Sequence, residues 1–344
     1  MFVFYVTKVL LTPDSYMDLF KETIIGGLKA RNHFVRSATA EGRATEDGFP
    51  TEQIKQVYLS LARGEVGTII TSLASVASYE KASRNQLAID RDELIPAYRK
   101  IADAVHAEGS NLIMQLFHGS STSQADPIHA RILGPSAIRN PLSGLLPQEM
   151  TSEDMREVSE LFAQAAVRAK EAGFDGVQLH GAHSCLLSQF LSPVFNRRDD
   201  AYGCSRENRY RFVGEVYEAV RAAVGTEYPV WIKIDSTDGF EDGLSMEDFL
   251  WNGEQLSKAG INAIEVSGLS QPRFYRGAYY REAAEKLAER VDASVILTGG
   301  IRSLEDMTEI CNESKVQFFG MARPFMRFPD YLLRLKKSEG ASQL

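Results

Sequence analysis

Eight short apolar runs, separated by longer stretches with helical patterning, constrain the fold of this chain most strongly. Each run has the length of a buried strand and is rich in β-branched or aromatic residues. The runs cover residues 32–38, 66–71, 111–116, 175–180, 229–234, 262–267, 294–299 and 316–320. Strands that alternate with helices are typical of parallel βαβ units. The pattern therefore favours an α/β fold, a single-domain (β/α)8 TIM barrel.

The main alternative is a doubly wound open sheet. A dinucleotide-binding fold of that kind carries GxGxxG after its first strand, and no such motif follows residues 32–38. The helical stretches have clear ends: the stretch over 152–173 begins at TSED, where Thr151 can cap the helix, and ends at Gly173. A length of 344 residues suits one barrel.

Composition excludes several classes of function. The net charge of −8 and the lack of a dense basic stripe argue against nucleic-acid binding. The apolar N-terminus is too short to span a bilayer, is interrupted by Lys8, and lacks the features of a signal peptide. We therefore expect no membrane partner, and treat residues 1–17 as an extension that precedes a barrel domain over 18–344.

Three cysteines, Cys185, Cys204 and Cys311, form no CxxC pair and no even framework. This spacing argues against disulfides and against a cysteine-ligated cluster. A reducing, cytoplasmic setting fits best.

The functional groups of a TIM barrel gather at the carboxyl ends of its strands, so a barrel predicts such groups at these positions of the sequence. Small or polar residues do recur at these ends, namely Ser37, Ala38, Thr39, Thr71, Ser72, Gln115, His118, His180, His183, Lys233, Ser267, Gly299, Gly300 and Arg323. A single polar strand end has little meaning. Together they indicate one site assembled from many loops.

The last two strands end in residues that suit a phosphate. Gly299 and Gly300 precede a helix, Gly320 ends the eighth run, and Arg323 follows it. Glycines allow close backbone approach, helix N-termini present N–H groups, and arginine adds charge-assisted hydrogen bonds. The plainer interpretation is that the glycines only make tight turns.

Gln115 and Lys233 suit the other end of such a ligand. A glutamine amide donates and accepts together, which matches the imide edge of a flavin ring. A lysine at the N1–C2=O position would stabilise the reduced, anionic ring. Alternatively, Lys233 simply points into solvent.

The run QLHGAHSCLLSQFLSP over 178–193 leaves three interpretations open. His180, His183 and Cys185 could ligate a metal, since zinc accepts both residue types. The histidines could instead donate hydrogen bonds to a substrate. Finally, Cys185 could be a nucleophile with His183 as its base, although no oxyanion hole is evident.

The residues also carry a family resemblance, which covers about 18–335. The chain resembles the Old Yellow Enzyme family of FMN-dependent ene-reductases, in its bacterial NADH:flavin oxidoreductase branch. The long segment HGAHSCLLSQFLSPVFNRRDDAYGCSRENRYRF is the most diagnostic part. Agreement in order and spacing extends to RNHFVRSATAEG, DGFPTEQ, GTIITSLASV, NQLAIDRDELIPAYRKIADAVHAEG, IMQLFHG, ILTGGIRSLED and GMARPF.

The resemblance implies FMN as cofactor and NADH or NADPH as reductant. It implies that the flavin ring is held by Ser37, Ala38, Thr39, Ser72, Gln115 and Lys233, and the phosphate by Gly299, Gly300, Ala322 and Arg323. His180 and His183 would be catalytic, hydrogen-bonding the carbonyl oxygen of an enone or enoate substrate, and Tyr275 would also bind substrate. Ping-pong hydride transfer through flavin N5 would then reduce the C=C bond.

The chain departs from the family pattern at three places. Cys185 stands where many members have a tyrosine that donates the proton, so Cys185, water, Tyr79 or Tyr275 could take that role. GSS follows His118 where relatives often have an arginine, and the C-terminus lacks the cysteine motif and second domain of the larger relatives. An isomerase or a weakly active flavin-binding protein is the alternative function. The physiological substrate, the choice of NADH or NADPH, and homo-oligomer formation stay open.

Overall fold

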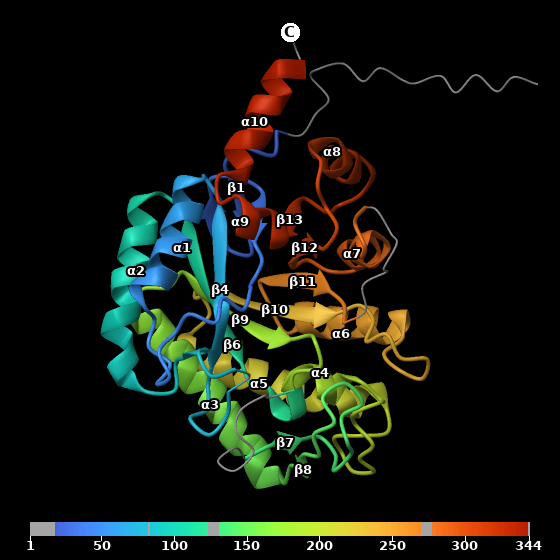
Figure 1. Ribbon diagram of the computed structural model, residues 1–344. Helices are drawn as coiled ribbons and strands as arrows, with labels where there is room; N and C mark the ends of the chain where they lie inside the picture. The colour runs from blue at the N-terminus through green and yellow to red at the C-terminus, as the bar shows by residue number, and fades with distance from the viewer. Residues whose placement is uncertain (1–17, 82, 123–130, 270–276, 343–344) are drawn as a thin grey trace, which may run out of the picture.

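A computed structural model of the chain describes residues 18–81, 83–122, 131–269 and 277–342. Its central sheet is a closed parallel barrel surrounded by helices (Figure 1). The barrel strands are β3 (Phe34–Arg36), β4 (Thr68–Ser75), β6 (Asn111–Phe117), β9 (Gly176–Gly181), β10 (Val230–Asp235), β11 (Ala263–Ser267), β12 (Ser294–Thr298) and β13 (Phe318–Met321). The sheet closes because β3 pairs with both β13 and β4. Each barrel strand overlaps one predicted run, so the predicted fold class is confirmed.

Helices connect the strands and cover the outside of the barrel. They are α1 (Glu52–Arg63), α2 (Ile95–Ala107), α3 (Ser152–Glu171), α4 (Leu186–Leu191), α5 (Arg206–Val224), α6 (Met246–Lys258), α7 (Arg281–Ala288), α8 (Leu304–Glu313), α9 (Arg323–Arg327) and α10 (Tyr331–Ser342). The predicted ends of α3 are confirmed: Thr151 and Asp154 form a reciprocal capping box, and Gly173 follows the helix at φ +84°. Helix α10 extends away from the barrel (Figure 1).

Short elements decorate the barrel. They are the hairpin β1 (Thr23–Ile25) and β2 (Leu28–Ala30), strand β5 (Leu87–Ala88), the pair β7 (Leu133–Gly134) and β8 (Gln148–Glu149), and the 3₁₀ turns η2 (Asp92–Leu94) and η3 (Ser120–Thr122). The hairpin closes the barrel floor, because the Trp231 indole N–H donates to Gly26 O at 3.1 Å. Trp231 lies in the buried apolar cluster that also contains Ile25 and Ala30.

Strand β4 differs from its prediction. It runs to Ser75, beyond the predicted end at Thr71, and its pairing with β6 shifts register between Ile70 and Leu73. This irregularity places Thr71 and Ser72 within the strand, although the sequence pattern put them at its exit. A bulge of this kind re-aims side chains, and Ser72 lines the cavity described below.

The barrel interior changes character along its axis. Inward-facing residues follow one another every second position along a strand. Ile113, Trp231 and Ile296 belong to the apolar cluster at the floor. Two positions further on, Gln115, Lys233 and Thr298 are polar and buried. The barrel therefore has an apolar floor and a polar layer above it.

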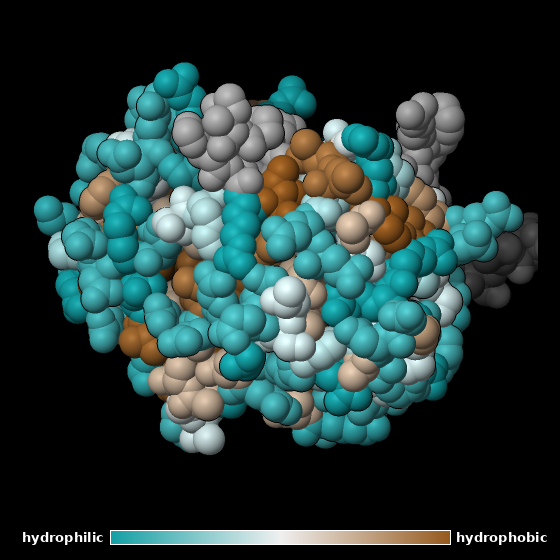
Figure 2. All heavy atoms as spheres, turned by 90° about the horizontal axis from the view of Figure 1, so that it is seen from below, coloured by the Kyte–Doolittle hydropathy of each residue, from teal (hydrophilic) through white to brown (hydrophobic). Residues whose placement is uncertain are grey.

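The outer surface seen from below is mostly hydrophilic (Figure 2). Small groups of hydrophobic side chains interrupt it. Among the described residues, the large apolar side chains that are more than half exposed are Ile24, Leu142, Leu146 and Met326. No helix within the described residues has the length and apolar character needed to cross a bilayer.

Candidate active site

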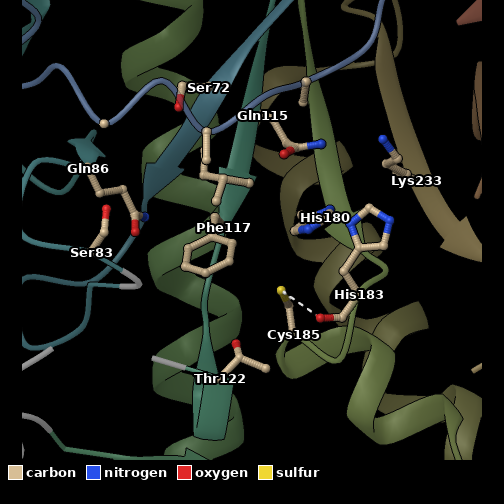
Figure 3. A pocket seen from close by; sticks show the side chains of 14 residues that line it. Ser72, Ser83, Gln86, Gln115, Phe117, Thr122, His180, His183, Cys185 and Lys233 are labelled. Carbon is tan, nitrogen blue, oxygen red and sulfur yellow. Dashed lines mark hydrogen bonds between the residues drawn. The ribbon is translucent and has the colours of Figure 1, made fainter. Parts of the chain in front are cut away.

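A cavity of about 410 Å³ opens at the carboxyl ends of the barrel strands. Its lining residues are Ala38, Ala40, Gly42, Ser72, Leu73, Ser83, Gln86, Gln115, Phe117, Thr122, His180, His183, Cys185 and Lys233. Figure 3 shows Gln115, His180 and Lys233 on adjacent strands, with Cys185 and Thr122 on the opposite side of the space. The predicted residues from five different strand ends therefore do meet in one site.

Other predicted residues lie outside this lining. Ser37 is buried beside it, and Thr39 donates its hydroxyl to Ser37 O at 3.2 Å. Tyr275 lies outside the described residues. Ser72 does line the cavity, but its backbone N–H already has a partner, because it donates to Tyr58 Oη at 2.8 Å.

The predicted phosphate residues come together around Tyr279. Gly299 and Gly300 adopt left-handed φ values of +102° and +81°. A Cβ on Gly300 would lie 1.7 Å from Gly277 O, which requires glycine there. Arg323 begins α9, directly after Ala322, and its Nη2 donates to Tyr279 Oη at 3.4 Å. The structure thus brings Gly299, Gly300 and Arg323 to one place, and their binding of phosphate stays a prediction.

Gln115 carries an unused acceptor. Its Nε2 donates to Gln178 Oε1 at 2.7 Å, while its buried Oε1 has no hydrogen-bond partner. A buried polar atom without a partner costs about 1–3 kcal/mol, so such atoms often mark a ligand position. An N–H donor such as flavin N3–H would satisfy it.

Lys233 lies across the same cavity. Its ammonium donates to Ser37 Oγ at 2.8 Å and lies 3.1 Å from Glu265 Oε1. Only 4% of the side chain is exposed, which excludes the alternative of a lysine in bulk solvent. An amide acceptor at Gln115 and an ammonium at Lys233 fit the imide edge of a flavin ring.

The two histidines are neutral donors at the mouth of the barrel. Burial lowers the pKa of His180 well below its ordinary value, and His183 and Lys233 lower it further. Burial and Lys233 also lower the pKa of His183, to about 3, although 40% of its side chain is exposed. The ring centroids are 5.2 Å apart, and the buried Nδ1 of His180 has no partner. Each neutral ring keeps one N–H to donate.

A strained turn presents His183. Both His183 and Ser184 have positive φ, near +60°, which is uncommon for residues with side chains. Asp235 holds this turn, because its Oδ2 accepts the His183 backbone N–H at 2.6 Å. Ser267 Oγ lies 2.9 Å from His183 Nε2 and fixes the ring. Burial raises the pKa of Asp235 to about 7.

Cys185 precedes helix α4 and lines the cavity. Its Sγ lies 3.7 Å from His183 O, and the residue is 5% exposed. Burial raises the pKa of the thiol well above its ordinary value, with Glu80 and Asp235 adding to the rise. The group is therefore a protonated thiol at neutral pH, which argues against the nucleophile interpretation.

Sequence reasoning missed several lining residues, among them Gln86, Phe117 and Thr122, and three buried polar residues that support the site. Asp235 and Glu265 are buried acids, and Gln178 links Gln115 to Glu265. The available signal was a charged or amide residue within or directly after each of three apolar runs, since such residues are rarely buried without partners. Within the described residues, no group of three or more His, Cys, Asp or Glu could hold a metal ion.

The fold and the site define a parallel barrel with one cavity at the carboxyl ends of its strands, lined by Gln115, Lys233 and the two histidines. A model of the NADH:flavin oxidoreductase / NADH oxidase family matches residues 18–340. The chain is 34% identical over 329 residues to an NADPH dehydrogenase of Geobacillus sp. (strain WCH70), covering 94% of this chain and 95% of that protein. It is 32% identical over 332 residues to an NADH oxidase of Thermoanaerobacter brockii, but spans only 51% of that relative's length.

A solved structure of morphinone reductase is also similar, with a TM-score of 0.83 and 25% identity over 95% of this chain and 91% of that one. The chain therefore belongs to the NADH:flavin oxidoreductase / NADH oxidase family. This membership confirms the resemblance to the Old Yellow Enzyme family, the predicted class of NAD(P)H-dependent oxidoreductase, and FMN as the cofactor.

Proposed function

We propose that this protein uses NAD(P)H to reduce the C=C bond of α,β-unsaturated carbonyl compounds. The observation that carries the proposal is the neutral pair His180 and His183 in the same cavity as Gln115 and Lys233. The pair lies beside the proposed ring position, so a substrate stacked on the ring would place its carbonyl oxygen at the two imidazoles.

Bound FMN supplies the redox chemistry by taking electrons from the nicotinamide and passing them to the substrate. Gln115 would hold the pyrimidine edge of the ring through its unpaired Oε1, and Lys233 would lie at the N1–C2=O position. Ala38, Ser72 and Leu73 line the same part of the cavity and would contact the ring. Gly299, Gly300 and Arg323 would hold the phosphate.

The histidines activate the substrate by donating hydrogen bonds to its carbonyl oxygen. Two N–H donors on the carbonyl oxygen withdraw charge from the alkene and stabilise the negative charge that develops on that oxygen. Asp235 and Ser267 keep His183 in place before substrate arrives, so little reorganisation is needed. Removing one such donor typically costs about 10²–10³-fold in rate.

Cys185 is our candidate for the proton donor to the α-carbon. It lines the substrate side of the cavity and carries its proton at neutral pH. Its raised pKa makes it a weak acid, which favours slow protonation. This property supports the second candidate function. In that case the protein is an isomerase, or a weakly active flavin-binding protein, that does not protonate the α-carbon efficiently.

Anaerobic titration of the purified, FMN-loaded protein tests the proposal. NADH or NADPH should bleach the flavin, and cyclohexenone should restore its colour with formation of the saturated ketone. Bleaching without reoxidation by any enone would favour the second candidate. A protein that takes up no FMN would contradict both.

A further inference from the structure

Glu265 is a buried carboxylate at the centre of the polar layer. Its Oε1 lies 3.1 Å from Lys233 Nζ and accepts the Thr298 hydroxyl at 2.8 Å and the Ser37 hydroxyl at 2.5 Å. Its Oε2 accepts the Gln178 amide at 2.8 Å. Burial alone would raise its pKa, but Lys233 and these donors hold the pKa below its ordinary value. Glu265 is therefore fully charged, at 0% exposure.

Stability does not explain this arrangement. Burying an ion pair costs desolvation, and well-packed apolar residues often serve as well or better. The floor layer on the same strands is apolar: Trp231 precedes Lys233 by two positions, and Ala263 precedes Glu265 by two. Gly320 leaves room for the pair, since a Cβ there would lie 2.0 Å from Thr298 Oγ1 and 3.3 Å from Glu265 Oε1.

The geometry fixes the ammonium that faces the cavity. Lys233 and Glu265 are directly paired residues on neighbouring strands β10 and β11. The Lys233 ammonium contacts both Ser37 Oγ and Glu265 Oε1, so two groups below the cavity determine its position. The positive charge of Lys233 is therefore held in a fixed position, and the Glu265 carboxylate partly offsets it.

We propose that Glu265 is a positioning residue that sets the reduction potential of bound FMN through Lys233. The inference rests on the ring position proposed above, with Lys233 at the N1–C2=O edge. An uncompensated ammonium there favours the anionic reduced ring. A carboxylate 3.1 Å away offsets much of that field, because charges interact strongly in a dry interior. The pair therefore lowers the potential relative to a lone lysine.

The test is the midpoint potential of FMN bound to Glu265→Gln, measured anaerobically against a reference dye. Glutamine keeps the size and an acceptor oxygen but removes the charge. The variant should bind reduced FMN about tenfold tighter relative to oxidised FMN, a rise of about 30 mV for a two-electron couple. The matched control, Thr298→Val, removes one hydrogen bond to the same carboxylate and no charge, so it should leave the potential nearly unchanged.

Lys233→Met separates this inference from the ring position. It should lower the potential, and adding Glu265→Gln to it should change little, because a buried carboxyl without its lysine takes up a proton. If the midpoint potential falls in Lys233→Met but does not rise in Glu265→Gln, the role of Glu265 is overturned and the ring position stands. Unchanged potential and FMN affinity in both would contradict the ring position itself. If Glu265→Gln does not fold, Glu265→Asp, which retracts the charge from Lys233, should give a smaller rise, and no rise would overturn the proposal.

Discussion

Two layers of the barrel interior lie two residues apart on the same strands and have opposite character. The floor layer contains Val35, Ile113, Trp231, Ala263, Ile296 and Phe318, all in one apolar cluster. The polar layer contains Ser37, Gln115, Lys233, Glu265, Thr298 and Gly320. One repeat of a strand, roughly 6.6 Å, separates them. From this comparison we expect the floor to supply stability, and we propose that Gln115 and Lys233 in the polar layer hold the flavin.

The largest expected effect lies above the polar layer, at the histidine pair. His180→Ala combined with His183→Ala should lower enone turnover by about 10³–10⁴-fold, because both donors to the carbonyl oxygen are lost. Bleaching by NAD(P)H should persist, since Gln115 and Lys233 are intact. Separate stopped-flow measurements of the two half-reactions check this split. Equal losses in both would contradict the assigned role of the pair.

Changes at the floor should cost stability instead. Trp231 is fully buried, and Trp231→Ala should lower the free energy of unfolding by about 3–5 kcal/mol through the cavity it leaves. Denaturant titration of the FMN-free protein measures this loss. The midpoint potential of FMN bound to the folded variant should equal that of wild type. A shifted potential would show that the two layers are not independent.

Asp235 adds a pH dependence to the stability. Burial raises its pKa from 3.8 to about 7, so the folded state binds a proton that the unfolded state releases. The contribution of this proton uptake to the free energy of unfolding is complete below about pH 3.8. It is lost as pH rises to about 7, by at most about 1.4 kcal/mol per pH unit. The stability of Asp235→Asn relative to wild type should therefore rise across this window. A difference that is constant with pH would contradict the shift.

The smallest expected effect is at Cys185. Cys185→Ala should lower enone turnover by about tenfold, below the usual range for a general acid because the buried thiol is a weak one. Cys185→Tyr should retain or raise the turnover. Product formation at the wild-type rate in Cys185→Ala would assign the proton to water or another group.

The sequence predicted the barrel because its signal is local. Each of the eight strands is an apolar run, and the ends of α3 are marked by Thr151 and Gly173. The site residues at strand ends, such as Gln115, His180 and Lys233, follow from the rule that barrel sites form there. The prediction needed only the number and order of the strands.

Side-chain partners could not be predicted in the same way. The pairing of Lys233 with Glu265 depends on the register of β10 with β11, which a single sequence does not specify. Beyond its cavity-lining residues His180, His183 and Cys185, the most diagnostic segment also contains residues that hold the structure together. Arg198 donates to Pro135 O and Met150 O, and Arg209 donates to Leu191 O. These two arginines hold loops together around the site.

Equilibrium FMN binding to Gln115→Leu tests the division between the layers most directly. The change removes the unpaired Gln115 Oε1, which favours the folded FMN-free protein, but it leaves Gln178 Oε1 without its donor, which disfavours it. The two effects oppose each other, so the stability of the FMN-free protein should change little. The dissociation constant for FMN should rise about tenfold, because one hydrogen bond to the buried ring is worth about 1.5 kcal/mol. An unchanged dissociation constant would contradict the claim that the polar layer holds the flavin.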